Sequence, residues 1–471
     1  MNRLLKLLHY IGIDKSIAYS SGGRVVQGLT GLASVYFIGT YLSPEGQGYY
    51  FTFGSVLALQ VFFELGLHNV LTQFTAHEKA HIEQDKYYNL IGESRYISRL
   101  SSILRFSVNL FAAISLVFAI VITCLGIYFF RSSTAPENGS VEWLTPWIIL
   151  SILSAVSLFM SPIYAILMGL SRVKDVSKIR FLQSVFMPLS VWTGLLLGLK
   201  LYVLPLSSFI SSAIGIFCMW RGDMFKQLNK IWIAYGSERV NYIHEIFPLQ
   251  WKMALSWISG YFIYQLFNPI LFRYVGAEAA GQMGMTMQVL NAIQAFSFSW
   301  MSTKIPTFST YIARHEFASL DSLFKKTLIQ LLSVCILILI AFIMVLNFID
   351  LILPIGISER FLYGLPLIII SFSIIPNQIL SSLANYLRCY KKEPLVFISI
   401  IIALLCTASS FICTQLYGLD GYGFSGSPPK RYVPLFAGQY AHTEVPPPLP
   451  DGYCMYSPPA PAFSLCLRHW R

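Results

Sequence analysis

The sequence predicts an all-α protein that crosses a membrane many times. Of its 471 residues, 55% are hydrophobic and only 12% are charged, whereas about a quarter of the residues in a soluble domain are charged. Eleven apolar runs of roughly 20 to 30 residues follow one another, and each can cross a hydrocarbon core of about 30 Å as a helix. The composition therefore excludes an ordinary soluble enzyme.

The apolar runs divide into two lobes. The first six define an N-terminal lobe, 1–220, and lie at 16–42, 46–76, 106–130, 143–171, 181–199 and 201–220. A hydrophilic segment of mixed charge, 221–245, is the predicted cytoplasmic loop between the lobes. Five more runs define a C-terminal lobe, 246–421, and lie at 246–272, 279–303, 327–349, 361–387 and 394–417. We therefore predict two helical lobes with six and five spans.

The segment 422–471 departs from this pattern. It holds ten of the 23 prolines and has no apolar run long enough to span a membrane. Because proline interrupts helices, we expect a disordered tail where a twelfth span is missing. Two origins stay open, a product translated out of frame and a genuine extracytoplasmic Pro-rich tail.

The distribution of Lys and Arg predicts the orientation. With the N-terminus in the cytoplasm, 23 basic residues fall on inner segments and four on outer segments, as the positive-inside rule requires. The net charge of +11 then reflects attraction to the inner leaflet. The basic residues are dispersed over six loops, so they indicate no nucleic-acid partner.

The two lobes begin alike, which indicates an internal duplication. Residues 41–48 join the first two spans as Tyr-Leu-Ser-Pro-Glu-Gly-Gln-Gly, and residues 274–284 join the seventh and eighth as Tyr-Val-Gly-Ala-Glu-Ala-Ala-Gly-Gln-Met-Gly. Both segments fall on the predicted outer side. Parallel repeats of this kind occur in many transporter folds.

Polar side chains within the spans form helical stripes, which predict a polar cavity. Such groups are costly against lipid and should face the bundle interior. They recur every three or four residues in spans 1, 2, 7, 8 and 10, whereas spans 3, 4, 6 and 9 nearly lack them. The candidate cavity residues are Arg24, Gln27, Gln60, Glu64, His68, Gln265, Asn268, Gln288, Asn291, Asn377 and Asn385. The alternative is helix packing through interhelical hydrogen bonds.

Arg24 and Glu64 are the charged members of this set, at similar predicted depth in the first two spans. An unpaired charge at the centre of a span costs about 3 kcal/mol, so each needs a partner or water. Arg24 is the candidate for binding an anionic headgroup, and Glu64 is the candidate for carrying a coupling proton or sodium ion. A structural ion pair between them is the alternative.

Two other motifs match known chemistry only in their letters. His77-Glu78-Lys79-Ala80-His81 has the spacing of a zinc-protease motif, but no second ligand motif accompanies it. Residues 421–426 fit a dinucleotide fingerprint, but Pro428 and Pro429 prevent the helix that must follow. We therefore expect no metal, no cofactor and no catalytic residue.

The chain resembles the polysaccharide-transporter branch of the MOP flippase superfamily, particularly Wzx-type O-antigen flippases, from about Lys15 to Gly421. The most specific segments are Gly22-Gly23-Arg24, residues 42–50 and residues 62–67. The resemblance implies a MATE-like fold with two pseudo-symmetric six-helix lobes around a central cavity, in the bacterial inner membrane with the N-terminus cytoplasmic. It also implies export of an undecaprenyl-diphosphate-linked oligosaccharide to the periplasmic leaflet, with polysaccharide polymerase and chain-length machinery as candidate partners.

We therefore predict a flippase that works by alternating access and is not an enzyme. Gln and Asn side chains suit sugar hydroxyls, and Arg24 suits a diphosphate through charge-assisted hydrogen bonds. A cation-coupled multidrug exporter of the same fold is the alternative. A membrane glycosyltransferase or polymerase is a third reading, but it would carry a large loop with clustered acids, which this sequence lacks.

Overall fold

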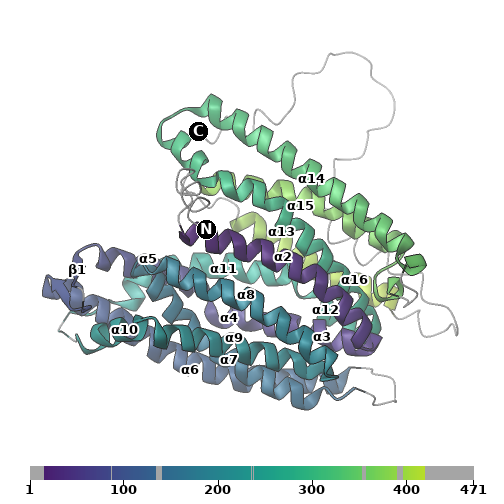
Figure 1. The fold of residues 1–471 in the computed structure, drawn as a ribbon, viewed down its shortest axis with the longest axis horizontal. Helices are drawn as coiled ribbons and strands as arrows, with labels where there is room; N and C mark the ends of the chain where they lie inside the picture. The colour runs from purple at the N-terminus through teal and green to yellow at the C-terminus, as the bar shows by residue number, and fades with distance from the viewer. Residues whose placement is uncertain are drawn as a thin grey trace.

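A computed structural model describes residues 15–85, 87–133, 141–234, 236, 238–352, 357–389 and 396–418. Most of its helices run along the long axis of the molecule, and helix α2 (Lys15–Tyr41) lies between the helices of residues 94–221 and those of residues 317–388 (Figure 1). The predicted tail, 422–471, lies outside the described residues. In helix α2 the side chains are described from Val26 onward, so the Arg24 side chain also lies outside.

The helices from α2 to α9 correspond to the predicted N-terminal lobe and are called the N-lobe below. It comprises α2 (Lys15–Tyr41), α3 (Pro44–Leu57), η1 (Ala58–Gln60), α4 (Val61–Glu64), α5 (Leu67–Lys79), α6 (Ser94–Ser132), α7 (Leu144–Gly169), α8 (Val173–Leu196), η2 (Lys200–Tyr202) and α9 (Val203–Arg221). Between α5 and α6, strands β1 (Ile82–Gln84) and β2 (Leu90–Gly92) pair antiparallel, with Glu83 opposite Ile91. This short hairpin is not among the predicted elements.

The helices from α11 to α16 follow a structured linker and are called the C-lobe. The linker holds α10 (Met224–Ile233) and the π-helical turn η3 (Tyr242–Ile246). The C-lobe comprises α11 (Phe247–Tyr264), α12 (Phe267–Tyr274), α13 (Ala277–Ala313), α14 (Phe317–Ile352), η4 (Ser358–Arg360), α15 (Leu365–Arg388) and α16 (Val396–Gly418).

The predicted apolar runs coincide with these helices, which confirms the helical membrane fold. Among the described residues, six helices are long and apolar enough to cross a bilayer, or seven if the bent pair formed by 44–64 and 67–79 is one span. This criterion rests on length and composition. The division into six and five spans, and the domain boundaries with it, stay predictions.

The second predicted span is broken rather than continuous. Its two parts meet at an angle of 42° where Leu65 and Gly66 adopt left-handed backbone conformations, with φ of 48° and 67°. Only glycine adopts this region at little cost, and a Cβ on Gly66 would lie 3.2 Å from Cβ of Met253 in α11. The break therefore places Glu64 at a helix end within the membrane-spanning segment.

The lobes meet mainly through the first two spans of each. Helix α2 packs against α8 of its own lobe and against α13 of the other, and α3 packs against α12 and α13. One continuous apolar core joins the lobes, and it includes Phe53, Trp147 and Phe272. Aromatic edge-to-face contacts fix this core, with ring centroids of Phe53 and Trp147 4.9 Å apart.

The linker is bound to the N-lobe by a row of side chains on α6. Arg105 donates to the carbonyl of Trp232 at 2.6 Å, and the Arg99 guanidinium bridges Glu78 of α5 and Glu245 of η3 at 2.9 and 2.6 Å. Helix α6 begins at Ser94, well before the predicted run at 106, because these polar first turns pack on the linker and on α5. The predicted loop 221–245 is therefore a structured segment that packs on the N-lobe, and it is called the linker cap below.

Candidate functional site

A cavity of about 610 Å³ lies between the lobes, and five of its seven polar lining side chains are amides. Helices α2, α3, α11, α12 and α13 and the break between α11 and α12 contribute its walls. The polar side chains lining it are Gln27, Ser55, Tyr264, Gln265, Asn268, Gln288 and Asn291. No charged residue lines it among those the structure describes. The cavity thus offers neutral hydrogen-bonding groups of both donor and acceptor type.

The lining amides differ in how firmly the protein holds them. Gln288 donates through Nε2 to the carbonyl of Gly31 at 2.9 Å, which joins α13 to α2. Asn268 is buried and donates through Nδ2 to Ser55 at 3.4 Å. Gln27 and Asn291 are exposed. We infer that the first two amides shape the cavity, and that Gln27 and Asn291 are accessible to a ligand.

The lobes are joined at one end of the cavity by the two repeated turns, a contact called the outer junction below. Gln47 donates through Nε2 to the carbonyls of Gly281 and Arg360 at 2.8 and 3.0 Å, and its repeat equivalent Gln282 donates to the carbonyl of Glu359 at 3.0 Å. Gly48 allows the close approach, because a Cβ there would lie 1.9 Å from the carbonyl oxygen of Ala277.

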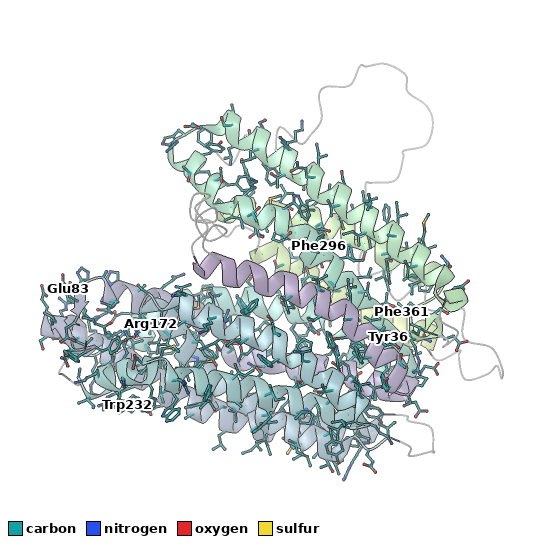
Figure 2. The ribbon with its side chains drawn as sticks, viewed as in Figure 1. Tyr36, Glu83, Arg172, Trp232, Phe296 and Phe361 are labelled. Atoms are coloured by element: carbon teal, nitrogen blue, oxygen red, sulfur yellow. The ribbon has the colours of Figure 1, made fainter. Side chains whose placement is uncertain are left out.

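Figure 2 places the outer junction relative to the linker cap. Phe361, next to Arg360, lies with Tyr36 at one end of the molecule, whereas Glu83, Arg172 and Trp232 lie at the other end. The outer junction and the linker cap are therefore at opposite ends of the molecule, and which end faces the cytoplasm stays a prediction.

A second polar cluster lies inside the N-lobe, where α4 meets α5, α7 and α8. The Ser161 hydroxyl donates to the Glu64 carboxylate, and His68 Nδ1 lies 3.1 Å from the Ser161 carbonyl. His68 Nε2 lies 3.5 Å from an Arg180 guanidinium nitrogen. Neither Ser161 nor Arg180 is among the predicted site residues. Ser161 lies in the fourth span, which has few polar residues, and Arg180 directly precedes the fifth span. Ser161 could have been found as a polar residue about as far along its span from the outer side as Glu64 is along the second span.

The other predicted site residues lie elsewhere. Gln60, Glu64 and His68 do not line the central cavity. Asn377 accepts a hydrogen bond from the lining residue Tyr264 at 3.2 Å, and Asn385 donates to Ser381 of its own helix at 2.8 Å. With the Arg24 side chain outside the described residues, pairing of Arg24 with Glu64 stays a prediction.

The His77–His81 motif is engaged in structural contacts. Glu78 is only 2% exposed and pairs with Arg99, and the ring of His81 stacks on that of Tyr96 with centroids 4.2 Å apart. Among the described residues no group of three or more His, Cys, Asp or Glu side chains could hold a metal ion.

Comparison with known proteins identifies the fold. No protein-family model matches the sequence, and no curated protein matches it either. A multidrug resistance MATE family transporter of the MOP superfamily, in an inward-facing conformation, is similar with a TM-score of 0.56 and 12% identity, covering 91% of this chain and 92% of that one.

Two further structures match over similar lengths. A MATE protein in its straight conformation has a TM-score of 0.49 and 13% identity over 91% of this chain and 93% of its own. An outward-facing MATE family transporter has a TM-score of 0.47 and 11% identity over 91% and 93%. The match at a TM-score of 0.56, together with the apolar helices, shows that the chain is a multi-pass membrane protein with the fold of the MATE family transporters of the MOP superfamily.

Proposed function

We propose that the chain is a flippase that moves an undecaprenyl-diphosphate-linked oligosaccharide from the cytoplasmic to the periplasmic leaflet by alternating access. The observation that carries the proposal is the central cavity between the lobes, lined by neutral amides. Amides hydrogen-bond sugar hydroxyls as donors and as acceptors. The resemblance of residues 22–24, 42–50 and 62–67 to polysaccharide transporters supports the same substrate class.

The diphosphate requires a positive partner, for which we propose Arg24. In α2 it precedes Gln27 by three residues, which places the two positions on one helix face. A guanidinium binds phosphate through two parallel hydrogen bonds. Arg24 would thus hold the diphosphate beside the amides that receive the sugar.

The alternative is a cation-coupled exporter of small molecules on the same fold. Its cationic substrates would favour carboxylates in the cavity, but no Asp or Glu lines the cavity in the described part of the chain. The neutral lining therefore favours the oligosaccharide over a cationic drug.

The test is transport by the purified chain in proteoliposomes, with a labelled undecaprenyl-diphosphate oligosaccharide and a fluorescent organic cation as competing substrates. We expect the oligosaccharide lipid to move. Removing the two exposed amides together, as Gln27→Leu with Asn291→Leu, should slow its transport about tenfold or more, since each lost hydrogen bond costs about 0.5–1.5 kcal/mol. Arg24→Ala should abolish transport and Arg24→Lys should retain part of it.

Asn347→Leu is the matched control, because Asn347 is exposed on α14 and its amide donates to the Ile343 carbonyl of its own helix. It should transport at the wild-type rate. Transport of the cation in place of the oligosaccharide lipid would refute the proposed substrate. Full activity in a stably inserted Arg24→Ala variant would refute the role of Arg24.

Energy coupling is the second part of the proposal, and we assign it to Glu64. The carboxylate lies at the helix break, hydrogen-bonded to Ser161, and His68 and Arg180 complete the cluster. These groups lie apart from the central cavity, so they can change protonation without contact with the substrate. Broken helices commonly carry the coupling sites of secondary transporters.

We expect Glu64→Gln to remove stimulation of transport by a pH gradient, about tenfold or more, while leaving thermal stability nearly unchanged, because glutamine still accepts the Ser161 hydrogen bond. Ser161→Ala should shift the pH dependence of transport. Ser157→Ala, in the same helix but hydrogen-bonded to Ser212 at 3.4 Å, is the control and should not shift it. A gradient effect that survives in Glu64→Gln would exclude Glu64 as the coupling group.

A further inference from the structure

A second cavity opens on the N-lobe and shares no lining residue with the central cavity. Its volume is about 510 Å³, within the range of about 300–1,000 Å³ that is typical for small-ligand pockets. It lies between α6, α7, α9 and the linker helix α10. The residues lining it are Leu104, Val108, Met160, Ile163, Ile216, Met219, Trp220, Phe225, Leu228, Asn229 and Trp232, of which only Asn229 has a polar amide.

The pocket has a buried floor and an exposed rim. Met160 and Met219 form the floor and are 6% and 8% exposed, whereas Trp220 and Phe225 are 72% and 61% exposed. Two tryptophans, Trp220 and Trp232, lie on its wall, and tryptophan concentrates where a bilayer meets water. An apolar pocket that opens at this level fits a hydrocarbon chain entering from the bilayer.

Basic residues outnumber acids beside the pocket. Arg221, Lys226 and Lys230 each directly follow a lining residue in the sequence, and the only acid among residues 220–233 is Asp223, which pairs with Lys226 at 2.8 Å. The Arg105 guanidinium lies 5.0 Å from the centre of the Trp232 ring. Figure 2 shows Trp232 at the same end as Arg172, the end predicted to face the cytoplasm. The rim therefore complements a negative headgroup beside the apolar pocket.

We propose that this pocket binds an anionic glycerophospholipid of the inner leaflet, with one acyl chain between α7, α9 and α10 and its phosphate near Arg221 and Lys226. The occupant is a bilayer lipid and not the transported substrate, because the residues that line this pocket are all different from those that line the central cavity. A bound lipid would hold α10, and through it the linker, against the membrane. The proposal does not depend on what the protein transports.

The experiment uses the full chain in nanodiscs with a phosphatidylglycerol probe that carries a photoactivatable group on its acyl chain, and a phosphatidylcholine probe with identical chains. Peptide mass spectrometry maps the labelled sites. We expect phosphatidylglycerol to label α7, α9 and α10. The double variant Arg221→Gln with Lys226→Gln should lose most of the preference over phosphatidylcholine, about fivefold for each basic residue removed. Both side chains are exposed, so this variant should keep the fold.

Ile163→Trp places a larger side chain in the pocket. It should lower phosphatidylglycerol labelling of α7, α9 and α10 by about fivefold. The matched control is Leu116→Trp, because Leu116 lies in α6 outside the pocket and is 65% exposed. It should leave the labelling unchanged. Equal labelling by both probes in the wild type would overturn the assignment of the headgroup. Undiminished labelling in a folded Ile163→Trp variant would overturn the assignment of the pocket.

Discussion

Gly48→Ala is expected to prevent the lobes from closing at the outer junction and to abolish transport. The new methyl group would lie 1.9 Å from the carbonyl oxygen and 2.5 Å from the carbonyl carbon of Ala277, both backbone atoms at the start of α13. A backbone cannot rotate away as a side chain can, so α3 and α13 must separate. Overpacking of this kind costs about 3 kcal/mol or more. Thermal unfolding of the purified protein and transport in proteoliposomes measure the two effects.

Gly260→Ala is the matched control, because no atom lies within 4 Å of the position a Cβ would take there, and Gly260 lies outside the central cavity. Alanine also has a higher helix propensity than glycine. We expect this variant to unfold at or slightly above the wild-type temperature and to transport normally. If Gly48→Ala behaved in the same way, the close contact of α3 with α13 would not be required.

Arg99→Ala should strongly weaken the attachment of the linker cap to the N-lobe. The Glu78 carboxylate is only 2% exposed and relies on Arg99, which also holds Glu245. Removing one partner of a buried ion pair leaves an uncompensated charge, at a cost of about 3–5 kcal/mol. Because the Arg99 side chain is 17% exposed, we expect the lower end of this range. The measurement is thermal unfolding of the purified variant.

The double variant Glu78→Leu with Arg99→Leu tests the cause, because it removes both buried charges together. It should recover most of the lost stability. A double variant as unstable as Arg99→Ala would instead place the loss in the contact with Glu245.

The ion pair between Arg99 and Glu245 makes the attachment of the linker cap sensitive to acid. The Arg99 hydrogen bond lowers the pKa of Glu245 below its ordinary value, although burial opposes the shift. A lowered folded pKa means that the stabilisation is fully present above the ordinary pKa and is lost as the pH falls through the lowered value. Glu245→Gln should therefore lose less stability than the wild type when the pH is lowered into that range.

Residue type and spacing alone determined the helices of this protein and the faces that carry polar groups. Because lipid offers no hydrogen-bond partners, an apolar run of sufficient length must satisfy its backbone as a helix. This is why the eleven predicted runs coincide with helices. Helical period also placed Gln288 and Asn291 on one face of α13 and Gln265 and Asn268 in neighbouring turns, and all four line the central cavity.

Only the tertiary structure decided which polar faces meet. Periodicity defines a face of a helix, but its neighbour depends on packing between helices distant in the sequence. Glu64 shares the stripe of the second span, but the left-handed turn at Leu65 and Gly66 separates it from the cavity and brings it to Ser161. Asn385 likewise bonds to its own helix. A helix break and a close glycine contact depend on atoms across the interface, such as Met253 beside Gly66, and no local pattern contains them.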